Sequence, residues 1–201
     1  MVIERYSTQK DLVEVTTNAI LLDCGCRVGD NTLNLATQID TKHLIDLVYN
    51  LRSLYKAYQR GILTIQSDLN HSIPILGHLI DVIIAKDVLE HLINPSVFVK
   101  EMYRVLNPGG YIILDIPNLA SWHNNFALLI GVQPFSGPYF TTMEDSDVGL
   151  VRQMNRTTHG LQEEGEFLEH GEQELTHDIK IIAYSSLISL LKRKGFKIEK
   201  A

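Results

Sequence analysis

A short glycine-containing turn near the N-terminus is the part of the sequence best suited to binding a small anion. The apolar residues 20–22 end on Asp23, then Gly25 and Gly29 follow, and a helical pattern starts directly afterwards. This order indicates a strand, a tight turn and a helix N-terminus, which together aim backbone N–H groups and the positive end of a helix dipole at one point. Such a point suits a carboxylate, a phosphate or a nucleotide sugar. The glycine spacing is not the Gly-x-Gly-x-x-Gly of dinucleotide sites, which disfavours a nicotinamide oxidoreductase.

Two cysteines, Cys24 and Cys26, lie inside this turn and are the only cysteines of the chain. A tetrahedral metal site would need further Cys or His ligands at a regular spacing, and none follows nearby in the sequence. We therefore expect no metal, and we expect both thiols to be small packing residues in a reducing compartment.

The composition indicates a soluble globular protein. Of the 201 residues, 45% are hydrophobic and 21% are charged, and the formal net charge is -6. An acidic chain lacks the basic surface that nucleic-acid binding normally uses, so we expect no nucleic-acid partner. No apolar run approaches the roughly 20 residues of a spanning helix, and the first residues do not resemble a signal peptide. We therefore expect a cytoplasmic protein without a membrane partner.

Strands and helices are expected to alternate along most of the chain. Apolar periodicity and glycine or proline stops predict strands at residues 19–24, 42–47, 62–66, 80–85, 110–116 and 196–200. They predict helices at residues 8–19, 30–38, 50–60, 95–106, 126–130 and 184–194. This alternation is typical of an α/β, doubly wound, mostly parallel Rossmann-like sheet with helices on both faces. Ligands of such sheets bind at the carboxyl ends of the strands. The polar residues expected there are Asp23, Asp46, Asp68, Lys86 and Asp87.

Residues 118–178 interrupt the alternation. They hold a short apolar helix candidate, a loop-like stretch and a polar, Glu-rich stretch. A long segment of this kind in a compact domain is typical of a lid or of a binding region. We therefore expect a single domain over residues 1–201 with one functional insertion.

Several short motifs occur in a fixed order along the chain. They are Leu21-Leu22-Asp23-Cys24-Gly25-Cys26-Arg27-Val28-Gly29, Asp87-Val88-Leu89-Glu90-His91, Arg104-Val105-Leu106-Asn107-Pro108-Gly109-Gly110 and Ile116-Pro117-Asn118. Together with the tail from Leu187 to Ile198, these motifs resemble the class I S-adenosylmethionine-dependent methyltransferase superfamily, in its small-molecule-type group. The resemblance covers nearly the whole chain. It implies the class I methyltransferase topology, S-adenosyl-L-methionine as the cofactor, and an insertion that lies on the acceptor side.

The resemblance also implies which residues contact the cofactor. They are Asp23, Cys24, Gly25, Cys26, Arg27, Gly29, Asp46, Leu47, Asp68, Leu69, Lys86 and Asp87. The amides of the turn suit the carboxylate of the methionine end, and Asp23 suits its ammonium. Asp46 matches an acid that binds the ribose hydroxyls, although it could instead cap a helix. Asp68 matches the acid that reads the adenine amino group, with Leu69 packing on the ring, or it is an ordinary loop acid.

Arg27 departs from the family pattern, which has a small residue at this position. Its side chain points into solvent, pairs with the cofactor carboxylate, or occludes the site, and the last arrangement would make the chain a non-catalytic relative. Lys86 and Asp87 match residues that line the methyl-transfer side. His91 is a candidate general base because imidazole titrates near neutral pH, but in this family the Glu-His pair is often structural. The sequence identifies no catalytic residue beyond this candidate.

Trp122 and His123 follow the fifth expected strand, near the acceptor entrance that the resemblance implies. They are candidate substrate contacts, although Trp122 could instead pack under the lid. The sequence thus predicts methyl transfer to a small or medium-sized acceptor molecule, with a non-catalytic binding or assembly module as the alternative. Family members normally add a seventh strand, which we expect to be missing here because the sequence ends at Ala201. An exposed edge of the fifth strand would then favour a homodimer.

Overall fold

The computed structural model describes residues 18–25, 29–131 and 179–198 of the chain. Its strands are β1 (Ile20–Cys24), β2 (His43–Val48), β3 (Leu63–Gln66), β4 (Ile80–Lys86) and β5 (Leu106–Asp115). Its helices are α1 (Asp30–Gln38), α2 (Leu51–Gln59), α3 (Pro95–Val105), α4 (Trp122–Leu129) and α6 (Tyr184–Arg193), with a 3-10 turn η2 (Leu89–His91). The helix expected at 8–19 lies almost entirely outside the described residues.

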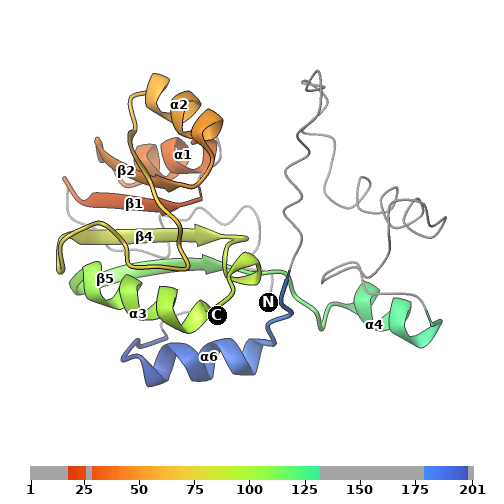
Figure 1. Cartoon of the computed structure of the whole chain (residues 1–201). Helices are drawn as coiled ribbons and strands as arrows, with labels where there is room; N and C mark the ends of the chain where they lie inside the picture. Colours follow the sequence, from red (N-terminus) through yellow and green to blue (C-terminus); the bar gives the residue numbers. More distant parts are fainter. Residues whose placement is uncertain (1–17, 26–28, 132–178, 199–201) are drawn as a thin grey trace, which may run out of the picture.

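The five strands form one parallel sheet in the order β3-β2-β1-β4-β5. Parallel neighbours need crossover connections, and helices α1, α2 and α3 supply them. The chain starts in the middle of the sheet, builds outward to β3, then returns beside β1 to build β4 and β5 (Figure 1). This arrangement confirms the predicted doubly wound α/β class, and the point where the order reverses lies between β1 and β4.

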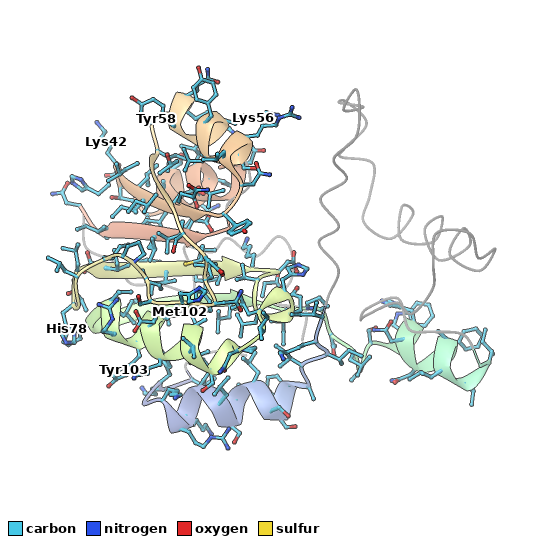
Figure 2. The ribbon with its side chains drawn as sticks, viewed as in Figure 1. Lys42, Lys56, Tyr58, His78, Met102 and Tyr103 are labelled. Carbon is cyan, nitrogen blue, oxygen red and sulfur yellow. The ribbon has the colours of Figure 1, made fainter. Side chains whose placement is uncertain are left out.

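Helices cover both faces of the sheet. On one face α3 and α6 pack on the strands through Phe98, Met102, Leu187 and Leu191 (Figure 1). Met102, labelled in Figure 2, has no exposed surface. On the other face α1 packs through Leu35, which is also fully buried. The strands are apolar on both sides because both sides are covered, which is why they read as continuous apolar runs in the sequence.

Helix α2 begins at a side-chain cap. The Asn50 side-chain oxygen accepts hydrogen bonds from the backbone N–H groups of Arg52 (2.8 Å) and Ser53 (3.2 Å). Asn50 therefore satisfies donors that the first helical turn leaves open. The alternative role of Asp46 as a helix cap is wrong, because Asp46 lies inside β2, four residues before this cap.

The junction between α3 and β5 differs from the prediction. The turn expected at residues 107–110 is part of β5, which starts directly after the helix at Leu106. The pairing with β4 shifts register there, between Ile80 and Val82. The Asn107 amide donates a hydrogen bond of 2.7 Å to Asp81 on β4, which holds the irregular residues in the sheet. Proline and glycine thus mark a bulge in this strand rather than its boundary.

The strand expected at 196–200 is wrong for the residues that the structure describes, because residues 196–198 do not pair with the sheet. Helix α6 ends at Arg193, and Gly195, with a φ of +97°, turns the chain toward α3. The Phe196 ring then meets the Tyr103 ring of α3 edge-on, with centroids 5.2 Å apart (Tyr103 is labelled in Figure 2). This aromatic contact and burial of Phe196 against the core hold the chain on α3 instead of beside β5.

Candidate cofactor and acceptor site

The carboxyl ends of β1, β2 and β4 bring the predicted site residues to one edge of the sheet. Asp23 on β1 pairs in register with Asp46 on β2 and with Ile84 on β4. Because parallel strands end at the same edge, the turn after β1 and Lys86 at the end of β4 share that edge. The sequence-based grouping of these residues is therefore reproduced in space.

The glycine turn leads directly from β1 into α1. The backbone N–H of Gly25 donates to the Leu47 carbonyl of β2 at 2.9 Å, so the turn starts level with Val48, the last residue of that strand. Gly25 has φ +85° and is exposed, which leaves its backbone open to a ligand. Gly29 has φ +87° and occupies the N-cap of α1. No side chain of the described residues caps α1. The first-turn amides and the dipole of a helix favour an anion at its N-terminus.

Two carboxylates lie side by side beneath this turn. Asp23 is 3% exposed and Asp46 is 0% exposed, and their register pairing puts both on the α1 side of the sheet. The Thr32 hydroxyl of α1 donates a hydrogen bond to Asp23. Burial raises the pKa of the Asp23 carboxyl from 3.8 to about 7, the Thr32 hydrogen bond opposes that shift, and the charge of Asp46 adds to it. Asp23 therefore titrates near neutral pH.

This burial bears on the ribose role expected for Asp46. The residue lies two positions before the end of β2, and its side chain has no exposed surface. Contact with a ribose would require the side chain to turn outward or the glycine turn to move. The ribose role stays a prediction, and the structure adds a second role for Asp46, a charge that acts on Asp23 from beneath the turn.

Cys24 and Leu47 point into the core rather than toward a ligand. Cys24 is 0% exposed and Leu47 is 1% exposed, and both belong to the cluster that packs on α3 and α6. Their side chains therefore hold the strand ends together, and any contact with a cofactor would come from their backbone. Cys26 and Arg27 lie outside the described residues, so the three arrangements of Arg27 stay open.

The loop after β3 holds Asp68 in a defined orientation. One carboxylate oxygen of Asp68 accepts from the backbone N–H and from the side-chain amide of Asn70, each at 2.9 Å. The other oxygen lies 3.2 Å from His71 Nδ1. The backbone hydrogen bond from Asn70 is the largest cause that lowers the pKa of Asp68. Asp68 is thus ionised at neutral pH and partly accessible, and Leu69 beside it is partly buried against the core.

The end of β4 has an unusual backbone. Asp87 has φ +50°, and its N–H donates to the Asp115 carbonyl at the end of β5 at 3.0 Å. This bond fixes the ends of β4 and β5 against each other and leaves Asp87 exposed at the shared edge. Lys86, in register with Asp115, is half-buried, and its positive charge lowers the pKa of Asp23. The charge of Lys86 at the end of β4 therefore acts on the Asp23 carboxyl of β1.

The Glu90-His91 pair lies on the short turn η2. The Glu90 carbonyl accepts hydrogen bonds from the N–H groups of Ile179 and Lys180, both at 3.0 Å. The His91 N–H donates to the Val88 carbonyl at 3.1 Å. The backbone of this turn thus ties the segment before α6 to the end of β4, which supports the structural interpretation of the motif. The role of His91 as a general base stays a prediction.

Trp122 and His123 begin α4. Their rings meet edge-on with centroids 4.8 Å apart, and the Trp122 side chain is 77% exposed. Helix α4 stands beyond the carboxyl end of β5 in Figure 1, and the role of Trp122 and His123 as substrate contacts stays a prediction.

Sequence reasoning missed Thr32, which binds the buried Asp23. Its only signal is its place three residues after Gly29, on the side of α1 that faces the sheet. Among the described residues no three His, Cys, Asp or Glu gather as a metal site would require. None of the described helices is long and apolar enough to cross a membrane.

Comparison with known proteins relates this fold to methyltransferases. Residues 22–114 match the family described as "Methyltransferase domain". A protein of Mycolicibacterium smegmatis, described as "Probable S-adenosylmethionine-dependent methyltransferase", is 36% identical over 55 residues. That match covers 25% of this chain and 21% of the relative, so the chain matches about a fifth of the curated relative's length.

Solved structures share the fold across nearly the whole chain. A methyltransferase of Mesorhizobium loti has a TM-score of 0.61 at 13% identity and covers 97% of this chain and 84% of its own. A methyltransferase of Thermotoga maritima has a TM-score of 0.58 at 14% identity, covering 94% and 68%. A [4+2]-cyclase, SpnF, also has a TM-score of 0.58, at 18% identity, covering 95% and 58%. The family match over residues 22–114 and the shared fold of these solved structures support the predicted resemblance to the S-adenosylmethionine-dependent methyltransferases, whose cofactor is S-adenosylmethionine.

Proposed function

We propose that the chain transfers the methyl group of S-adenosylmethionine to a small or medium-sized acceptor molecule that enters over the ends of β4 and β5. One observation carries the proposal. The exposed Gly25 follows β1 next to the reversal of strand order, and α1, which no side chain of the described residues caps, begins a few residues later at Asp30. This is the place where a doubly wound sheet binds its ligand.

The residues at this edge fit the cofactor. The amides of the first turn of α1 suit the carboxylate of its methionine end, because the helix dipole favours an anion there. Glycine at positions 25 and 29 lets the two ends of the turn lie close to Val88 and Ile62, which a Cβ would meet at 3.3 Å and 2.5 Å. The ionised Asp68 suits the exocyclic amino group of adenine, with Leu69 beneath the ring.

Methyl transfer needs little from the side chains of this chain. S-adenosylmethionine supplies a methyl group on a sulfonium, and the acceptor displaces it in line. The protein has to align the acceptor and exclude water, and an apolar site favours the reaction because the positive charge disappears. Lys86 and Asp87 stand at the edge where the acceptor would approach. We propose no general base, since no described contact marks one.

The alternative is a chain that keeps the fold without methyl transfer, as a binding or assembly module. The resemblance to SpnF, whose name is that of a cyclase, supports keeping this alternative, since the same fold occurs under another activity. Binding of the cofactor's product separates the two in part, and turnover with a suitable acceptor separates them fully.

Calorimetric titration with S-adenosylhomocysteine tests the proposed cofactor site. We expect micromolar binding, and we expect Asp68→Asn to weaken it about tenfold, because a hydrogen bond to a charged group is lost. S-inosylhomocysteine lacks the amino group. It should bind the wild-type chain more weakly than S-adenosylhomocysteine does, whereas the Asp68→Asn variant should bind both compounds with equal affinity. Leu76→Gln, on an exposed loop residue away from the site, is the control. Absence of binding in the wild-type chain would contradict the proposal.

A further inference from the structure

Helix α4 carries an exposed apolar face. Trp122, Phe126, Leu129 and Ile130 are 77%, 56%, 82% and 59% exposed. Their spacing of four, three and one residues puts them on one side of the helix and its last turn. We call these four residues the α4 apolar face. Contiguous exposed apolar surface of this kind marks an interaction site rather than ordinary surface.

The opposite side of α4 is attached to the protein. Asn124 and Ala127 are 1% and 2% exposed. The Asn124 amide donates to the Asn118 carbonyl at 3.0 Å, and the Asn118 side chain accepts from the Ala120 N–H at 3.0 Å. The helix therefore has a fixed inner side and outer side, and the apolar face is the outer one.

This face lies on the acceptor side of the candidate site. Helix α4 follows β5 after six residues, and the end of β5 is hydrogen-bonded to Asp87 at the edge where the acceptor would approach. In Figure 1, α4 stands out beyond the carboxyl ends of β4 and β5, away from the layers of the fold. A surface bound by the α4 apolar face would thus lie next to the site of methyl transfer.

The chemistry of the face points to a lipid bilayer as its occupant. Residues 116–143 contain no Asp, Glu, Lys or Arg, so nothing in this stretch selects a charged partner. The face is on a protruding helix rather than in a pocket, which suits insertion into a bilayer surface better than enclosure of a single apolar molecule. Tryptophan at the start of such a helix is favoured at the membrane–water interface.

We propose that the α4 apolar face binds the surface of a lipid bilayer and that the methyl acceptor is a molecule presented at that surface. The statement about the acceptor rests on the proposed methyl transfer, whereas the statement about bilayer binding does not. The sequence-based expectation of no membrane partner rested on the missing spanning helix, and peripheral binding needs none.

Fluorescence of Trp122 tests the proposal directly, since it is the single tryptophan of the chain. With phosphatidylcholine vesicles we expect a blue shift of its emission, quenching by brominated acyl chains and co-sedimentation of the protein. Added salt should leave binding nearly unchanged, because the face carries no charge. Emission that vesicles leave unchanged, with the protein remaining in the supernatant, would overturn the proposal.

Two other outcomes would also overturn it by naming a different occupant. A blue shift that depends on protein concentration without vesicles would mean that a second copy covers the face. Emission that is already blue-shifted in the dilute protein, and shielded from acrylamide, would mean that the chain covers its own face. Both outcomes predict no further change on adding vesicles.

Matched variants separate this proposal from the proposed function. Leu129→Gln should lower the affinity for vesicles about tenfold, because a leucine side chain is no longer inserted into the bilayer. Leu76→Gln removes a leucine of similar exposure, 78%, from a loop before β4 and should leave vesicle binding unchanged. Both variants should bind S-adenosylhomocysteine as the wild-type chain does. Equal vesicle binding by Leu129→Gln and the wild-type chain would count against the α4 apolar face.

Discussion

At the scale of single residues, Gly29 connects the candidate turn to the core. Its φ of +87° suits glycine, and a Cβ there would lie 2.5 Å from Ile62 Cδ1. We expect Gly29→Ala to destabilise the fold by about 2 kcal/mol through both effects. Urea unfolding measures the loss.

Gly61 provides a matched control for this substitution. It has φ +84°, but a Cβ there would meet nothing within 4 Å. Gly61→Ala should therefore cost only the backbone term, about 1 kcal/mol. Adding Ile62→Val to Gly29→Ala should recover part of the difference, because Val lacks the Cδ1 atom. Equal losses for the two glycine variants would show that the contact with Ile62 does not matter.

Asp23 predicts an unusual dependence of stability on pH. Burial raises the pKa of its carboxyl to about 7 in the folded protein, from the ordinary value of 3.8 that applies in the unfolded chain. Between these two values the folded state keeps a proton that the unfolded state has lost, so stability falls as pH rises and levels off above the folded pKa. The full difference is on the order of 4 kcal/mol. Urea unfolding from about pH 5 to about pH 8 covers the upper part of this range, in which stability should fall by about 3 kcal/mol.

The Asp23→Asn variant should lose most of this slope, because the amide does not titrate in that range. It keeps an oxygen that can accept from Thr32. Asp68→Asn serves as the contrast, since the pKa of Asp68 is lowered and its contribution to stability is lost only in acid. A wild-type stability that stays constant between about pH 5 and about pH 7 would contradict the buried-proton interpretation.

At the scale of elements, α3 holds the connection between β3 and β4 through one arginine. Arg104 donates to the carbonyls of Ile75 (2.9 Å) and Ile73 (2.8 Å), and it pairs with Glu101 at 2.7 Å. Glu101 in turn accepts from the Ile73 N–H at 3.0 Å. The Arg-Val-Leu motif is therefore structural: it fastens a loop that has no regular structure of its own to a core helix.

Arg104→Lys should destabilise the protein by about 2 kcal/mol, because a lysine ammonium cannot reach both carbonyls and the carboxylate together. Chemical unfolding measures the change, and hydrogen exchange should show faster exchange at residue 73. Arg193→Lys, on the exposed surface of α6, is the control and should change stability little. A similar loss of stability in both variants would contradict the proposed role of Arg104 in fastening the loop to α3.

At the scale of the whole molecule, protection should fall from the centre of the sheet outward. β1 and β4 have a paired strand on each side, and residues such as Leu22 and Ile83 have no exposed surface. We expect their amides to exchange slowest with deuterium and those of α4 to exchange fastest among the described helices. S-adenosylhomocysteine should slow exchange in the first turn of α1. Fast exchange in β4 together with slow exchange in β3 would contradict the strand order, in which β4 is internal and β3 lies at an edge.

Much of the fold could be predicted because local patterns carry it. Helix α1 begins and ends where the sequence places it, and the other described helices and strands except β5 and α4 differ from prediction by at most two residues at either end. The misplaced boundaries have tertiary causes. β5 starts early because Asn107 is held by Asp81, and no sixth strand forms at residues 196–198 because Phe196 packs on Tyr103. Asp81 is far from Asn107 in the sequence, and Tyr103 is far from Phe196, so local patterns could not predict either contact.

The sequence by itself determined the fold class, the alternation of elements and the glycine turn, because each depends on neighbours along the chain. Only the tertiary structure decided that Asp23 and Asp46 lie side by side, buried, beneath that turn. Only it showed which side of α4 is exposed. The physical reason is that pairing of strands and burial depend on residues far apart in sequence, and the electrostatics of a carboxylate follow from that burial.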